Sequence, residues 1–136
     1  SRKQSALSNV PNQISVNEET NESTAHRLVQ RYLYELTTRQ LYCDPEFNRE
    51  MLLEELHMPK STFWKMFEEE TGQQFAPYLL NLRLEHAAEV IRNHPEWTID
   101  AIASESGFAG RSTFYKNFTI RFGISPAVYR NEVEKV

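Results

Sequence analysis

Apolar side chains recur every three or four residues through most of the chain, which is the spacing of helices with one buried face. Between about residues 21 and 42 this stripe consists of Leu28 or Val29, Tyr32, Leu33 and Leu36. The pattern predicts a helix that ends before Pro45, because the residue before a proline is driven out of the helical region. Residues 1–20 are rich in Ser, Asn and Gln without clear periodicity, so they are predicted to form a flexible linker.

The rest of the chain predicts further helices and no strand, so the expected fold class is all-α with about seven helices. Asn48 and Thr98 stand where a helix needs a cap, and Ser125-Pro126 opens the last helix. His94-Pro95 ends the longest one. The predicted helices cover residues of about 49–56, 60–70, 75–93, 99–106, 111–122 and 126–133.

The chain contains an internal repeat, which outranks any single motif as a guide to the fold. Residues 60–67 (KSTFWKMF) match residues 111–118 (RSTFYKNF) at an offset of 51. Upstream, Leu52-Leu53 matches Ile102-Ala103 at an offset of 50, so one residue is inserted in the second turn. Two copies are too few for a solenoid. The pattern predicts two helix-turn-helix subdomains, at about 48–72 and 98–123, joined by a long linking helix of about 75–93.

Each repeat carries short polar and basic side chains on its second helix, opposite a stripe of phenylalanines. Phe63 with Phe67, and Phe114 with Phe118, are four residues apart and are expected in the core. In a helix-turn-helix, the outer face of the second helix enters the DNA major groove. Trp64 and Tyr115 lie at the border of this face, so core packing and DNA contact both remain open for these two residues. The candidate DNA-contacting residues are Ser61, Thr62, Trp64, Lys65, Arg111, Ser112, Tyr115 and Lys116.

Charge is distributed unevenly along the chain. The 136 residues carry 15 basic and 19 acidic side chains, a formal net charge of −4. Phe108–Arg130 reverses this sign locally, with four basic side chains and no acidic one, while residues 1–56 hold six basic and nine acidic side chains. The balance argues against a nonspecific nucleic-acid coat but not against a specific reader, because the distribution of charge matters more than its sum.

Other classes of function fit the sequence less well. The four histidines lack metal-ligand spacing, the glycines form no phosphate loop and Cys43 has no activating partner, so the sequence predicts no enzyme, metal or cofactor. No run of 18 apolar residues predicts a membrane span. Two alternatives remain, a helical bundle with a solvated basic face and a degenerate helix-turn-helix that binds a protein. The overall acidity and Glu68-Glu69-Glu70 support the latter.

Longer motifs add to the repeat, namely Leu52-Leu53-Glu54-Glu55-Leu56, Glu70-Thr71-Gly72, Leu82-Arg83-Leu84-Glu85-His86-Ala87, Ser106-Gly107-Phe108 and Phe122-Gly123-Ile124-Ser125-Pro126. With them, the chain from Leu41 to Arg130, about two thirds of its length, resembles the DNA-binding domain of the AraC/XylS family. The segment around Leu41-Tyr42 and Asp44-Pro45 is similar to members found in Bacteroidetes.

The resemblance implies that both subdomains read one face of double-stranded DNA, in major-groove segments about 34 Å apart. It implies a cytoplasmic transcription regulator, most often an activator that contacts RNA polymerase, with no small-molecule site in this domain. Because the chain starts without Met, it is expected to be part of a longer protein. The resemblance implies a sensor or dimerisation domain upstream of Ser1, with a membrane anchor as a further possibility. Glu68-Glu69-Glu70 and Pro59 depart from the family pattern, and they predict weaker docking of the first unit.

Overall fold

The computed structural model describes the backbone of residues 10–135 and the side chains of residues 22–135, and this part of the chain holds helices but no strand. The all-α prediction is confirmed. Within residues 10–135, six α-helices and two 3₁₀ turns follow in the order α1 (Val10–Thr38), η1 (Leu41–Cys43), η2 (Arg49–Leu52), α2 (Lys60–Thr71), α3 (Phe75–Asn93), α4 (Ile99–Glu105), α5 (Arg111–Phe122) and α6 (Pro126–Glu134).

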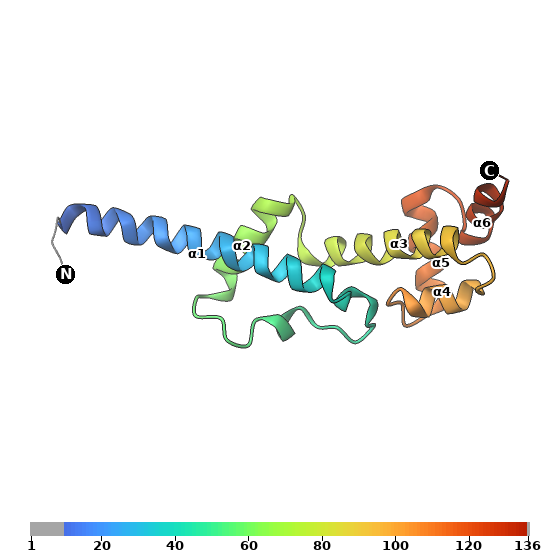
Figure 1. The fold of residues 1–136 in the computed structure, drawn as a ribbon, viewed down its shortest axis with the longest axis horizontal. Helices are drawn as coiled ribbons and strands as arrows, with labels where there is room; N and C mark the ends of the chain where they lie inside the picture. Colours follow the sequence, from blue (N-terminus) through green and yellow to red (C-terminus); the bar gives the residue numbers. More distant parts are fainter. Residues whose placement is uncertain (1–9, 136) are drawn as a thin grey trace.

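The helices form two packed groups that share α3 (Figure 1). α1, η1 and α2 pack around its first half, and α4, α5 and α6 pack around its second half. The N-terminal part of α1 extends beyond the rest of the molecule (Figure 1). This arrangement agrees with the predicted pair of units joined by a long linking helix, and we refer to the two groups as the first unit and the second unit.

The core of the first unit is built around Tyr32 of α1. Val29, Tyr32 and Leu36 are buried on one face of α1, as the apolar stripe predicts, and they pack against Phe63 and Phe67 of α2. The Tyr32 ring centroid lies 5.3 Å from that of Phe63 and 6.2 Å from that of Phe67. Burial raises the pKa of the Tyr32 hydroxyl, which remains a hydrogen-bond donor inside the core.

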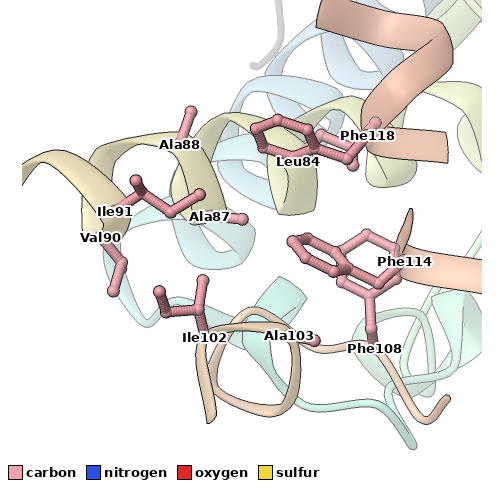
Figure 2. Packing of buried hydrophobic residues seen from close by; sticks show 10 residues of the cluster. All are labelled: Leu84, Ala87, Ala88, Val90, Ile91, Ile102, Ala103, Phe108, Phe114 and Phe118. Atoms are coloured by element: carbon pink, nitrogen blue, oxygen red, sulfur yellow. The ribbon is translucent and has the colours of Figure 1, made fainter. Parts of the chain in front are cut away.

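The core of the second unit lies between α3 and the helices that follow it. Figure 2 shows Phe114 and Phe118 of α5 turned toward one side of α3, with Phe108 beside them. The ring centroids of Phe108 and Phe114 are 5.0 Å apart, within the range of edge-to-face aromatic pairs. The buried residues of α3 and α4 in this cluster are Leu84, Ala87, Ala88, Val90, Ile91, Ile102 and Ala103.

The prediction of a helix at about 49–56 is wrong. This segment forms the short turn η2, followed by hydrogen-bonded turn residues. Asn48 caps η2, its Oδ1 accepting from the Glu50 N–H at 2.8 Å. The Leu53 N–H then bonds to the Glu50 carbonyl rather than to that of Arg49, which accepts from the Tyr32 hydroxyl at 2.8 Å. The segment is therefore closed by a bond three residues back and is held to α1 by a tertiary hydrogen bond.

The start of α1 also differs from the prediction. The helix begins at Val10 rather than near residue 21, so residues 10–20 of the predicted flexible linker are helical. Extending a helix from a turn that the core already fixes costs little per residue, which is why weak local periodicity suffices here. Residues 1–9 of the predicted linker lie outside the described residues.

The two units meet at Gly107, in the turn between α4 and α5. Its φ of 95° lies in the left-handed region that favours glycine, and a Cβ there would overlap the carbonyl oxygen of Tyr42. Arg83 of α3 donates from Nε to the same carbonyl at 2.7 Å and from a terminal nitrogen to the Asp44 carbonyl at 3.0 Å. The Arg83 guanidinium is therefore a structural link between α3 and the first unit.

Candidate nucleic-acid interface

α2 and α5, the second helices of the two repeats, are built alike at both ends. Each begins after a residue that offers no side-chain cap, Pro59 or Gly110. Each ends at a glycine with positive φ, 73° at Gly72 and 81° at Gly123, whose N–H closes the last helical turn. The backbone N–H groups at both helix starts lack a capping side chain, which favours binding of an anion there.

The faces of these two helices match the sequence prediction. Their phenylalanines at the predicted core positions are fully buried, with 0% exposure at Phe63, Phe67, Phe114 and Phe118. Six of the eight predicted contact residues are exposed, namely Ser61, Thr62, Lys65, Arg111, Ser112 and Lys116. The structure thus brings three predicted contact residues of each unit to one helix surface, while their contact with DNA stays a prediction.

Trp64 is a predicted contact residue that the structure turns toward the core. Its half-buried ring lies between 4.9 and 5.6 Å, centroid to centroid, from the rings of Phe63 and Tyr32. Its Nε1 is buried without a hydrogen-bond partner among the described residues. The guanidinium of Arg49 covers the ring at 4.8 Å from its centroid. The Trp64 ring thus packs against the first core, one of the two possibilities that the sequence leaves open, and its contact with DNA stays a prediction.

Tyr115, the equivalent residue of α5, is also half-buried and packs against the second core. The guanidinium of Arg111 lies 5.0 Å from its ring centroid, and one terminal nitrogen of Arg111 is 3.5 Å from the Tyr115 hydroxyl. Tyr115 therefore supports the exposed Arg111 as well as the core. The border position of the recognition face is an arginine-covered aromatic ring in both units.

The first turn of each recognition helix also carries an ion pair. Lys60 Nζ lies 3.3 Å from Glu50 Oε1 in the first unit, and Arg111 Nε lies 3.4 Å from Asp100 Oδ1 in the second. Lys60 matches Arg111 at the offset of 51, and Glu50 matches Asp100 at the offset of 50. The repeat therefore extends to an ion pair that joins each helix to the segment before it. We call η2 and α4 the support segments, and α2 and α5 the recognition helices. Exposed pairs of this kind contribute about 0–1 kcal/mol to stability.

The other basic side chains of α2 and α5 differ in whether they form ion pairs. Within the described part of the chain, neither Lys65 nor Lys116 has a carboxylate at ion-pair distance. Arg121, by contrast, pairs with Glu85 of α3 at 2.9 Å. Glu68 and Glu69 of α2 are exposed beside Lys65.

Glu70 has a structural role that separates it from the other two acids. It lies 2.7 Å from His26 Nδ1 and accepts from the amide of Gln30, so it binds α2 to α1. The acidic run of α2 is therefore split, with two carboxylates on the exposed face and one held by α1.

Comparison with known proteins decides the family. A model of a helix-turn-helix domain, of the AraC type, matches residues 52–132. The chain belongs to the AraC/XylS family. The family resemblance predicted from the motifs is confirmed, and this AraC-type chain is a DNA-binding helix-turn-helix domain of a transcription regulator. Such regulators are not enzymes.

Two curated AraC/XylS relatives are named transcriptional activators. RhaR of Pectobacterium carotovorum is 36% identical over 84 residues, which are 62% of this chain and 29% of that protein. RclR of Escherichia coli is 31% identical over 80 residues, 59% of this chain and 28% of that protein. The chain thus spans less than a third of the length of these relatives.

Solved AraC-type domains share the fold. The C-terminal domain of AraT, a response regulator from Geobacillus stearothermophilus, superposes with a TM-score of 0.68 at 26% identity, covering 77% of this chain and 84% of that one. The DNA-binding domain of AdpA, solved in complex with a target DNA, gives a TM-score of 0.69 at 22% identity, covering 79% of this chain and 93% of that one.

The described part of the chain has no membrane-spanning helix and no metal-binding cluster. Across residues 10–135, no helix combines the length and apolarity that a membrane span needs. Among the side chains of residues 22–135, histidine, cysteine and carboxylate groups form no cluster of three suited to a metal ion. Cys43 is half-buried, and burial raises the pKa of its thiol, which lowers the fraction of reactive thiolate.

Proposed function

We propose that this domain binds a specific sequence in double-stranded DNA by placing α2 and α5 in successive segments of the major groove. The observation that carries the proposal is the duplicated surface. In both helices, exposed hydroxyls and a lysine without an ion pair in the described part of the chain lie opposite a buried phenylalanine stripe. Folding requires the phenylalanines but does not require the matching Ser-Thr and Lys on the outer face. A shared function of the outer face accounts for the matching Ser-Thr and Lys in the two helices.

The two roles of the surface follow from its chemistry. Lys65 and Lys116 sit one turn into their helices beside Ser61 and Ser112, where they reach base edges if the helix start faces the groove. The uncapped helix starts favour a backbone phosphate at the same place. The AdpA domain, which has the same fold, was solved with a target DNA, which supports this use of the fold.

The role of the whole protein extends the proposal. Relatives named as activators favour activation of transcription, which in turn requires contact with RNA polymerase. Because the chain spans less than a third of those relatives, a sensor or dimerisation domain elsewhere in the protein would supply the signal. The proposal places the protein in the cytoplasm.

Selection from random duplexes followed by mobility-shift titration tests the proposal. Two half-sites should emerge about one helical turn apart, since α2 and α5 would bind on one face of the duplex. Inserting five base pairs between them should abolish two-unit binding, whereas Ser112→Ala in α5 should relax preference in one half-site. A selected pool with a single half-site, unaffected by the insertion, would contradict binding by both units. A domain that enriches no sequence would favour the protein-interaction alternative.

A further inference from the structure

Arg49 lies beside α2 but belongs to the support segment, and sequence patterns gave it no role. Its backbone is fixed on both sides. The Tyr32 hydroxyl donates to its carbonyl at 2.8 Å, and the preceding Asn48 accepts from the Glu50 N–H at 2.8 Å. Its side chain is exposed, and its guanidinium rests on the Trp64 ring at 4.8 Å from the centroid. A fixed backbone and a stacked guanidinium hold this cation in one place.

The second unit reaches the same arrangement by another route. Trp64 corresponds to Tyr115 at the offset of 51, and the Tyr115 ring is covered by Arg111 at 5.0 Å. Arg111 comes from α5 itself, whereas Arg49 comes from η2. At the offset of 50, Arg49 matches Ile99, a half-buried residue packed against the second core. An arginine on an aromatic ring thus recurs on both recognition helices although the arginines are not equivalent in sequence.

The position of the ring places Arg49 at the recognition surface. Trp64 follows Ser61 by one helical turn and precedes Lys65, so its outer edge borders the exposed face of α2. Arg49 has no carboxylate at ion-pair distance within the described residues, whereas Lys60 is paired with Glu50. Of the cations beside the start of α2, Arg49 is the one that is both fixed and unpaired.

We propose that Arg49 binds a phosphate of the DNA backbone beside α2, an inference that rests on the proposed function. A guanidinium stacked by its face keeps N–H donors along its edge, and these match the oxygens of a phosphate. Phosphate is favoured over a base edge because η2 flanks the recognition helix, and in a helix-turn-helix the supporting element crosses the backbone. Arg49 then adds a phosphate contact at the border of the α2 surface, where Trp64 lies.

The test measures the affinity of the 136-residue chain for its selected duplex and for an unrelated duplex over a series of salt concentrations. Arg49→Ala should weaken binding to both duplexes by a similar factor. With one phosphate contact fewer, the loss of affinity between 50 and 200 mM salt should be about threefold smaller than in the parent. The matched control is Arg27→Ala, which removes the same charge from an exposed residue of α1 and should leave the salt dependence unchanged.

Two further variants separate charge from packing. Arg49→Met keeps an apolar stem on Trp64 without charge and should behave as Arg49→Ala does. Arg49→Lys should recover the salt dependence but only part of the affinity. Equal salt slopes in Arg49→Ala and Arg27→Ala, or a loss confined to the selected duplex, would overturn the inference. Failure of the proposed function is seen separately, because the parent domain would then prefer no sequence before any substitution is made.

Discussion

Each unit has a recognition helix of the same design, α2 or α5, but the elements that support this helix differ between the units. In the second unit, the regular helix α4 precedes α5, and the glycine turn at Gly107 joins them. In the first unit, the equivalent segment forms only η2, and the long helix α1, which lies outside the repeat, supplies much of the core. The comparison teaches that the aromatic stripe and the glycine end define the recognition helix, while the support is exchangeable.

The electrostatic difference between the units is smaller than the sequence alone indicates. The offset of 51 places Glu68 and Glu69 of α2 against Thr119 and Ile120 of α5, which disfavours the first unit near phosphate. In the other direction, Arg121 of the second unit is paired with Glu85, and Arg49 adds an unpaired cation to the first unit. Stronger docking of the second unit stays a prediction.

The largest effects should come from the two cores and should be alike. Phe67→Ala and Phe118→Ala each remove a fully buried ring, which should cost about 3–5 kcal/mol of unfolding free energy. Urea unfolding measures both losses. Ser112→Ala is the control, because removal of an exposed hydroxyl should change stability by less than about 0.5 kcal/mol. If Phe118→Ala unfolds the second unit alone, the two cores are independent. If either phenylalanine variant loses as little stability as Ser112→Ala, the burial of that phenylalanine is contradicted.

The next largest effect compares Gly107, where a Cβ would meet other atoms, with Gly123, where it would meet none. Gly107→Ala should cost more than the roughly 1–3 kcal/mol of a left-handed residue, because its Cβ would also overlap the Tyr42 carbonyl. Gly123→Ala is the matched control, since its φ is 81° and no atom lies within 4 Å of a Cβ built there. Thermal unfolding ranks the two variants. Equal losses would show that the contact between the units yields without cost.

Local patterns predicted what local interactions determine. The helical spacing of Phe63, Phe67, Phe114 and Phe118 identified both buried stripes, and Asn48 and Thr98 were identified as caps. The helix predicted at 49–56 is wrong, and the local pattern gives no signal for the hydrogen bond from the Tyr32 hydroxyl, 17 residues away, that holds this segment at the Arg49 carbonyl. No sequence signal could have found Arg49 on Trp64, since the contact depends on that same tertiary anchor.

A smaller effect concerns the bases. Lys116→Ala should cost more binding free energy than Lys65→Ala, with a good base contact worth about 1–3 kcal/mol. Both lysines are exposed without a carboxylate partner in the described part of the chain, but Lys65 has Glu68 and Glu69 one turn away. Titration with the selected duplex measures the two losses. Equal losses would remove the asymmetry between the units.

The smallest effect per residue concerns those two acids. Replacing Glu68 and Glu69 by Lys reverses two exposed charges, each worth up to about 1 kcal/mol at a surface, on the face that carries Lys65. Repulsion from phosphate becomes attraction, so binding should tighten on every duplex and its salt slope should steepen by about one counterion per new phosphate contact. The control exchanges Glu89 and Glu134, exposed acids of α3 and α6, for Lys. That variant has the same net charge, so a nonspecific field effect would tighten its binding equally. If both double variants show the same slope, proximity to α2 has no role, and Glu68 and Glu69 do not weaken the docking of the first unit.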